Sequence, residues 1–473
     1  MKQNKSKTES LNSRALKAGL WYTVCNFIVR GINFLTTPLF TRIISKADYG
    51  NYSNYTSWLS LLTILTTLDL YTSISRAKFD YKDDLDQYVS SIQILGTMVT
   101  AGCFAVVNVF SSFFESFFGM DMVYINIMFI YLLVAPSFTL LQTKHRQLMK
   151  YKAVTLITFI STMATVITSV LLVLCMENDF LARVVGNTVI MFVLCVVVYA
   201  YNLIKGRAVK LEHWKYALAI SIPLIPHVLA GNILGTSDRI MITRYCGSES
   251  TALYSVIYSC SLIVQLLFQS VNQAWSPWFY EQLSVKNTKT IAKASKIYIV
   301  CAAFILATVM LAGPEIVFIF GGSAYAESAS IMPPIMLGCF YWCLYTFFVN
   351  TEIFYKKTFS ISVKTISAAI VNLVLNFIFI QLIGWQAAAY TTLFGYFLLL
   401  ILHSITGRKL GTDEYFDRKF FYGIAAIMFF IMIGIEFLYN FFIIRLVIFL
   451  VMAAVVAYFV IKNYKKVLSF LRK

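Results

Sequence analysis

Five polar side chains recur along one face of the first apolar segment, and the central one is an arginine. The five are Thr23, Asn26, Arg30, Asn33 and Thr37. Their spacing of three or four residues places them on a single stripe of an α-helix. An arginine in the middle of a bilayer costs ~2.5 to 3.5 kcal/mol, so it needs water, an anion or a carboxylate beside it. The stripe therefore predicts a polar, positively biased cavity inside a membrane protein.

Three further apolar segments carry polar stripes with a similar rhythm. They consist of Thr56, Ser60, Thr63 and Thr67 in the second segment, Thr155, Thr158, Thr162, Thr165 and Ser169 in the fifth, and Gln265, Gln269, Asn272 and Ser276 in the eighth. Such side chains either line a cavity, or tie helices together and bond to the carbonyls of their own helix. We expect the first, second and eighth segments to form cavity walls.

The seventh apolar segment combines two prolines with a histidine. Pro223 and Pro226 remove backbone donors and are expected to bend the helix at a point where it can flex. His227 would either contact the substrate or carry a proton, or be a buried neutral histidine bonded to a hydroxyl. Asn232 occupies the position that Arg30 has in the first half of the chain.

Charged residues complete the set of candidates. Asp69, in the inner part of the second segment, would pair with a basic group such as Arg30 or bind a coupling cation. The candidates for an outer gate are Arg42, Asp238, Arg239 and Arg244. No connection is long enough to hold a folded catalytic domain, so we do not expect an enzyme.

The composition is that of a polytopic helical membrane protein. Of 473 residues, 59% are apolar and 13% charged, which is far from the balance of soluble proteins. The apolar runs are about 20 residues long, as helices need and barrel strands do not. The nine cysteines lie in or beside apolar runs, without histidines at ligand spacing, so neither a metal site nor a disulfide is expected.

The lysines and arginines predict the topology. We interpret the chain as fourteen spans, and most basic residues then fall in the connections on the side of both termini. By the positive-inside rule this side is cytoplasmic. The net charge of +17 follows from the same bias, so no nucleic-acid partner is expected.

The two halves of the chain contain an internal repeat. Residues 41–57 align without a gap onto residues 243–259, an offset of 202, although chance similarity of two short loops is the alternative. The predicted organisation is an N-terminal six-helix half (1–205), a C-terminal six-helix half (206–410) and a further transmembrane pair (411–473). Halves of six spans share their orientation, which is the parallel-repeat arrangement of alternating-access transporters.

Four segments resemble the O-antigen and polysaccharide flippase family, which belongs to the multidrug/oligosaccharidyl-lipid/polysaccharide exporter superfamily. They are PLFTRIISKADYGNYS, SIPLIPHVLAGNILGTSDRIMI, ALYSVIYS and IFGGSAYAESASIMPPIMLG. The resemblance implies that undecaprenyl-diphosphate-linked oligosaccharide is moved across the bacterial inner membrane by alternating access. Basic groups would take the diphosphate and polar stripes the sugars.

The resemblance also implies the partners and leaves alternatives open. Partners would be the lipid-linked glycan, membrane lipids and polysaccharide polymerase machinery; no cofactor is expected beyond coupling to a Na⁺ or H⁺ gradient or to the membrane potential. The predicted substrate path contains Asn26, Arg30, Asn33, Thr63, Thr67, His227, Asn232, Gln265, Gln269 and Asn272. A lipid II flippase would share the cationic cavity, whereas a multidrug or cation antiporter of the same fold would favour carboxylates.

Overall fold

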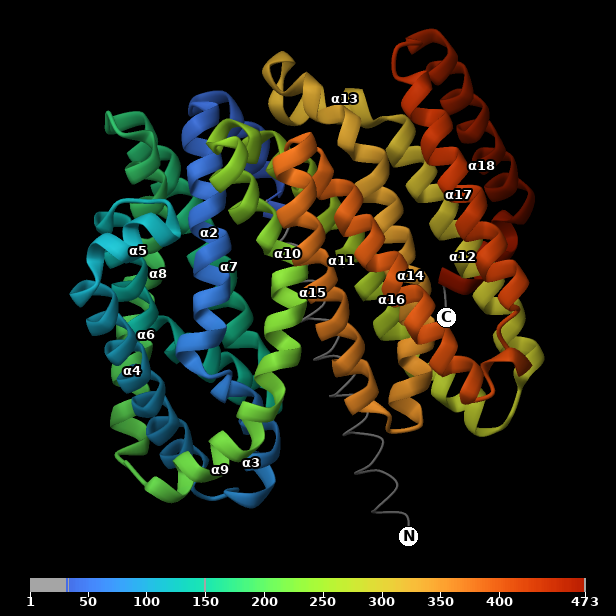
Figure 1. Ribbon diagram of the computed structural model, residues 1–473. Coiled ribbons are helices and arrows are strands. Elements are labelled where there is room, and N and C mark those ends of the chain that lie inside the picture. Colours follow the sequence, from blue (N-terminus) through green and yellow to red (C-terminus); the bar gives the residue numbers. More distant parts are fainter. Residues whose placement is uncertain (1–30, 33, 149, 472–473) are drawn as a thin grey trace. The chain divides into compact units, whose positions relative to one another are not determined.

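The computed structural model describes residues 31–32, 34–148 and 150–471, and within these ranges the chain is helical without a β-strand (Figure 1). The predicted all-α fold class is confirmed. The elements up to the middle of the chain are α2 (Lys46–Thr67), the 3₁₀ helix η1 (Leu70–Ser73), α3 (Ile74–Asp80), α4 (Leu85–Val109), α5 (Ser111–Phe118), α6 (Met122–Gln147), α7 (Tyr151–Cys175), α8 (Asp179–Gly206), α9 (Leu211–Ser221), η2 (Ile222–Leu224) and α10 (Ile225–Cys246). They are followed by α11 (Ser248–Ser284), α12 (Thr288–Leu311), α13 (Gly313–Gly321), η3 (Ser323–Ile331), α14 (Met332–Phe354), α15 (Thr358–Ile383), α16 (Ala387–Lys409), η4 (Thr412–Glu414), α17 (Arg418–Leu438) and α18 (Phe442–Leu471).

Eleven helices in the described ranges are long and apolar enough to cross a membrane. One of them is the interrupted helix from α9 to α10, and another joins η3 to α14. The polar stripe of α2 keeps that helix out of the set, and α18 contributes only a shorter apolar stretch, Phe442–Ala454. The chain is thus a multi-pass membrane protein, while the total of fourteen spans stays a prediction.

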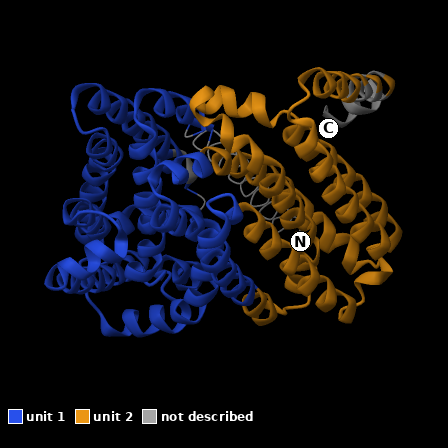
Figure 2. Ribbon diagram, turned by 45° about the horizontal axis from the view of Figure 1, so that its top comes forward, with its two compact units in different colours: residues 1–255, 365–388 blue, residues 256–364, 389–473 orange. Residues whose placement is uncertain are grey.

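The chain forms two compact units, coloured separately in Figure 2. Unit 1 comprises residues 1–255 and 365–388, and unit 2 comprises residues 256–364 and 389–473. The predicted boundaries at 205 and 410 rest on internal repetition, which is a different property from compactness. They stay a prediction.

The two aligned repeat segments each contain the start of a helix, and these starts are separated by the same offset as the segments. α2 starts at Lys46 and α11 at Ser248, 202 residues later. At the start of α2, the Ser45 hydroxyl accepts from the backbone N–H of Asp48 at 3.0 Å, which satisfies one of the unpaired donors of the first turn. A Cβ on Gly50 would lie 1.7 Å from the carbonyl oxygen of Ser248, so a glycine is needed where these two helix starts touch.

Helix packing in unit 1 builds the frame of the candidate site. α8 packs against α7, α6 and α4, α4 also packs against α6, and α2 packs along α10. Gly186 lets α8 approach α7 closely, since a Cβ there would lie 2.4 Å from the Cα of Ser169. The predicted break in the seventh segment is present: Pro223 lies in η2, a single 3₁₀ turn between α9 and α10, and Pro226 opens α10.

Candidate functional site

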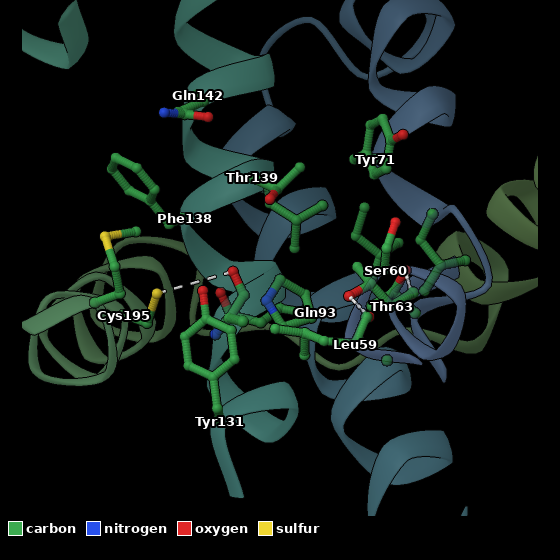
Figure 3. Close-up of a pocket in the computed structure, with 18 of the residues that line it drawn as sticks. Leu59, Ser60, Thr63, Tyr71, Gln93, Tyr131, Phe138, Thr139, Gln142 and Cys195 are labelled. Atoms are coloured by element: carbon green, nitrogen blue, oxygen red, sulfur yellow. Dashed lines mark hydrogen bonds between the residues drawn. The ribbon is translucent and has the colours of Figure 1, made fainter. Parts of the chain in front are cut away.

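Unit 1 contains a partly open cavity of about 470 Å³ among α2, η1, α4, α6, α7 and α8 (Figure 3). Its polar lining consists of Thr56, Ser60, Thr63, Thr67, Tyr71, Gln93, Tyr131, Thr139, Gln142 and Thr158. None of the described lining residues is charged. The volume falls in the range of ~300 to 1,000 Å³ that small-molecule sites have.

The predicted stripe of the second segment forms one wall of this cavity. Thr63 donates its hydroxyl proton to the carbonyl oxygen of Leu59 at 2.6 Å, and Thr67 donates to that of Thr63, also at 2.6 Å. Both interpretations of the stripe therefore hold, because the hydroxyls bond to their own helix and still line the cavity. With its proton engaged, each hydroxyl has only acceptor lone pairs left for a ligand.

Ser60 of the same stripe connects two helices. Its hydroxyl donates to Oδ1 of Asn232 at 2.8 Å, and the Asn232 amide in turn reaches the carbonyl of Val228. α2 is thereby bonded to α10, and Asn232 supports the cavity wall from behind, since it is not among the lining residues.

The opposite side of the cavity, shown in Figure 3, is formed mainly by α6. The lining includes two glutamines that the sequence interpretation missed, Gln142 from α6 and Gln93 from α4. Gln142 donates through Nε2 to the hydroxyl of Thr158 at 2.9 Å. Gln93, on α4, is held more tightly, because it donates to the carbonyl of Tyr199 at 3.2 Å and accepts from Asn202 at 2.8 Å. In the sequence, both glutamines could have been recognised as amide side chains within an apolar run.

The cavity therefore offers uncharged hydrogen-bonding groups between apolar surfaces. Acceptors come from the threonine hydroxyls and from the Gln142 carbonyl, and phenol groups come from Tyr71 and Tyr131. This combination suits a polyhydroxylated ligand, whose hydroxyls donate to acceptors and whose ring faces pack on apolar side chains.

Asp69 lies directly beside this cavity, between the lining residues Thr67 and Leu70. It is fully buried, and the side chains of Tyr71 and Thr72 interact with its carboxylate. Leu68 and Asp69 both adopt the left-handed conformation, with φ of 51°. Burying a carboxylate on a left-handed turn is costly.

The outer-gate candidates do not share one environment. Asp238 is 1% exposed and accepts hydrogen bonds from the Tyr254 hydroxyl at 2.5 Å and from the Asn376 amide at 2.6 Å. Asn376 also bonds to Asn372, so the cluster joins α10 to α15 within unit 1. Of the three arginines, Arg239 donates to the carbonyl of Gly235, Arg244 to that of Ser116, and Arg42 is exposed.

The candidates on α11 belong to unit 2 and are engaged with their own neighbours. Gln265 reaches the thiol of Cys339 at 3.8 Å, and Asn272 accepts from Asn350 at 2.7 Å. Gln269 is half-buried. Asn272 also borders a void of about 10 Å³, which barely holds one water molecule.

A buried charged cluster in unit 2 escaped the sequence interpretation. Lys364 donates to both carboxylate oxygens of Glu352 at 2.7 Å, and Nδ1 of His403 lies 2.7 Å from one of the same oxygens. All three residues are at most 8% exposed, and the ring of Tyr345 stacks on that of His403. Lys364 lies on α15. A glutamate and a histidine inside apolar runs were the features of the sequence that could have indicated the cluster.

The remaining predicted residues divide into two groups. His227 is half-buried, and its Nδ1 has no hydrogen-bond partner in the described part of the chain. Asn26, Arg30 and Asn33 lie outside the described residues, so the arginine stripe stays a prediction.

Comparisons with known proteins were made on sequence and on fold. Residues 15–284 match the family model described as polysaccharide biosynthesis protein. A protein of Haemophilus influenzae named Lsg locus putative protein 1 is 23% identical over 299 residues, which cover 58% of this chain and 68% of that protein.

Two solved structures show the fold. A lipid II flippase, MurJ, in an inward closed conformation superposes with a TM-score of 0.70 at 13% identity, covering 95% of this chain and 99% of that one. A MOP superfamily transporter from Pyrococcus furiosus gives a TM-score of 0.58 at 13% identity, covering 84% and 96%.

Proposed function

Because the chain belongs to the polysaccharide biosynthesis protein family, we propose that it flips an undecaprenyl-diphosphate-linked oligosaccharide across the bacterial inner membrane. The cargo would be the repeat unit of O-antigen or of another surface polysaccharide. The family and the fold are those of transporters and flippases, and the prediction that the chain is not an enzyme is thereby confirmed.

The observation that carries the proposal is the uncharged, hydroxyl- and amide-lined cavity of unit 1. A cationic drug would require a carboxylate in the cavity wall, and the described lining has none. Sugar hydroxyls match the acceptors of Thr63, Thr67 and Gln142. In this proposal the diphosphate binds the guanidinium of Arg30, whose planar fork suits phosphate oxygens.

Transport by alternating access would expose this cavity first to the cytoplasm and then to the outer side. Both termini would be cytoplasmic, and the polymerase that extends the glycan would receive the cargo on the outer side. Reporter fusions after Lys473 and within residues 111–121 test the orientation: the first is expected inside and the second outside.

Asp69 is the proposed site of coupling to a cation gradient. Its burial supports this role, because a bound proton or Na⁺ would neutralise the buried charge. Asp69→Asn is expected to abolish the ion dependence of export while membrane abundance is kept. Full ion dependence in this variant would make Asp69 a structural residue.

The function itself is tested in cells from which the gene has been deleted. We expect loss of the surface glycan, accumulation of its lipid-linked precursor on the inner leaflet, and restoration by the full chain. If the glycan were unaffected and peptidoglycan synthesis stopped instead, the chain would be a lipid II flippase. Changed drug resistance with normal glycan would identify a multidrug antiporter.

A further inference from the structure

A second cavity in unit 1, of about 310 Å³, is separate from the site described above and shares no lining residue with it. It is formed by the start of α2, the turn between α5 and α6, and the start of α8. Its polar lining consists of Asp48, Asn51, Asn54, Asp121, Tyr124 and Asn178. All three segments are predicted to lie on the outer side of the membrane.

The cavity wall offers both hydrogen-bond acceptors, such as the carboxylates of Asp48 and Asp121, and hydrogen-bond donors, such as the side-chain amide of Asn51 and the Tyr124 hydroxyl. Asn54 is 3% exposed, and its Nδ2 donates to the carbonyl of Phe118 at 3.4 Å, so it fixes the wall rather than facing a ligand. Asp121 begins α6 without a capping bond from its side chain. The carboxylate of Asp48 accepts from the hydroxyl of Ser45 at 2.6 Å and has further lone pairs. A ligand that fits must therefore bring both donors and acceptors, as hydroxyl groups do.

The shape and the aromatic wall favour a ring-shaped organic ligand over a metal ion. Tyr124 stacks on Phe180 with ring centroids 4.1 Å apart, and both rings belong to residues that line the cavity. A calcium ion needs six to eight oxygens at ~2.3 to 2.6 Å, far closer than a cavity of this volume provides. Among the described residues no three His, Cys, Asp or Glu side chains are grouped for a metal ion.

The charge of the cavity lining determines whether a neutral or an acidic sugar can bind. Asp48 and Asp121 both contribute carboxylates, which repel an acidic sugar or a phosphate and accept hydrogen bonds from neutral hydroxyls.

We propose that this cavity is a binding subsite for a neutral sugar, which receives part of the exported glycan on the outer side. The proposal rests on the proposed function for the identity of the cargo. The sugar selectivity rests on the cavity alone.

The experiment titrates the full chain in lipid nanodiscs with N-acetylglucosamine and with glucuronate, observed by saturation-transfer NMR. We expect the neutral sugar to bind, and glucuronate to bind at least about tenfold more weakly. Asp121→Asn removes a charged acceptor and should weaken the neutral sugar about tenfold, since a hydrogen bond to a charged group contributes ~1.5 kcal/mol or more. Asp121→Asn should also reduce the difference in affinity between N-acetylglucosamine and glucuronate.

Asp121 is exposed, so the substitution leaves folding intact, and the equally exposed Asp83 supplies the control Asp83→Asn. Terbium luminescence on the same samples tests whether the cavity binds a cation instead. Sugar binding that is indifferent to Asp121→Asn, or terbium binding at micromolar concentration that this variant abolishes, would overturn the proposal.

The failure of this inference is distinguishable from the failure of the proposed function. If Gln142→Leu, in the larger cavity, removes sugar binding and Asp121→Asn does not, the subsite is wrong and the flippase proposal stands. If deletion of the gene leaves the surface glycan intact while Asp121 still controls sugar binding, the sugar site stands and the flippase proposal is wrong.

Discussion

Unit 1 and unit 2 differ in how the polar side chains inside their apolar helices are used, because only some of those in unit 1 line the larger cavity. In unit 1, the hydroxyls and amides of α2 and α6 border a cavity of about 470 Å³ and keep acceptors for a ligand. In unit 2, Glu352, Lys364 and His403 bond to one another, and Asn272 is bonded to Asn350. A polar stripe in a membrane helix can thus bind a ligand or stabilise the fold. The hydrogen-bond partners of its side chains show which of the two applies.

The largest effect is expected from the charged cluster of unit 2. Glu352→Gln leaves Lys364 as a buried cation without its counter-charge and should destabilise the protein by ~3 to 5 kcal/mol. Thermal unfolding of the purified chain and its abundance in the membrane measure this. Asp417→Asn, which breaks the exposed pair with Lys296, is the control and should change little. If Glu352→Gln unfolded at the same temperature as the wild type, the cluster would have no structural role.

A smaller loss of stability is expected where α7 and α8 meet in the frame of the cavity. Gly186→Ala should cost ~1 to 3 kcal/mol, because the new methyl group would overlap the backbone of Ser169. Gly102→Ala on α4 meets nothing within 4 Å and serves as the matched control. Equal unfolding temperatures of the two variants would show that the helices separate easily at this point.

The open polar groups of unit 1 should affect transport more than stability. Gln142→Leu removes the amide that faces the cavity and should lower surface-glycan export about fivefold, as expected for one lost hydrogen bond. Gln381→Leu is the matched control, since Gln381 is exposed and bonds to its own helix. Reduced abundance of Gln142→Leu without a transport defect would place this residue with the structural groups of unit 2.

The smallest effect concerns an exposed carboxylate at the end of α3. Hydrogen bonds from the Tyr216 hydroxyl, at 2.6 Å, and from Arg76 hold the pKa of Asp80 below its usual value of 3.8. The stabilisation is present above the unfolded pKa and is lost as the pH falls through the folded pKa. Unfolding temperatures between pH 5 and pH 3 should therefore fall slightly less for Asp80→Asn than for the wild type. An identical pH profile would show that this pair contributes nothing.

The sequence predicted the elements better than their partners. The periodicity of Thr56, Ser60, Thr63 and Thr67 was sufficient to place the wall of a cavity, since a helix face follows from spacing alone. The stripe with Gln265 and Asn272 has the same spacing, yet it is consumed by contacts with α14, which spacing does not encode. The Glu352 cluster was missed because its members come from three helices more than ten residues apart.

The central claim is that the cavity of unit 1 holds the lipid-linked glycan during transport. It is tested most directly by placing a photoreactive amino acid at position 142 or, as a control, at Leu171, which is 56% exposed on α7. Cells that depend on this chain for their surface glycan are labelled with radioactive sugar and irradiated. We expect a radiolabelled, glycan-bearing adduct at position 142, more abundant when the polymerase is absent, and none at position 171. No adduct at 142, or equal adducts at both positions, would contradict the account.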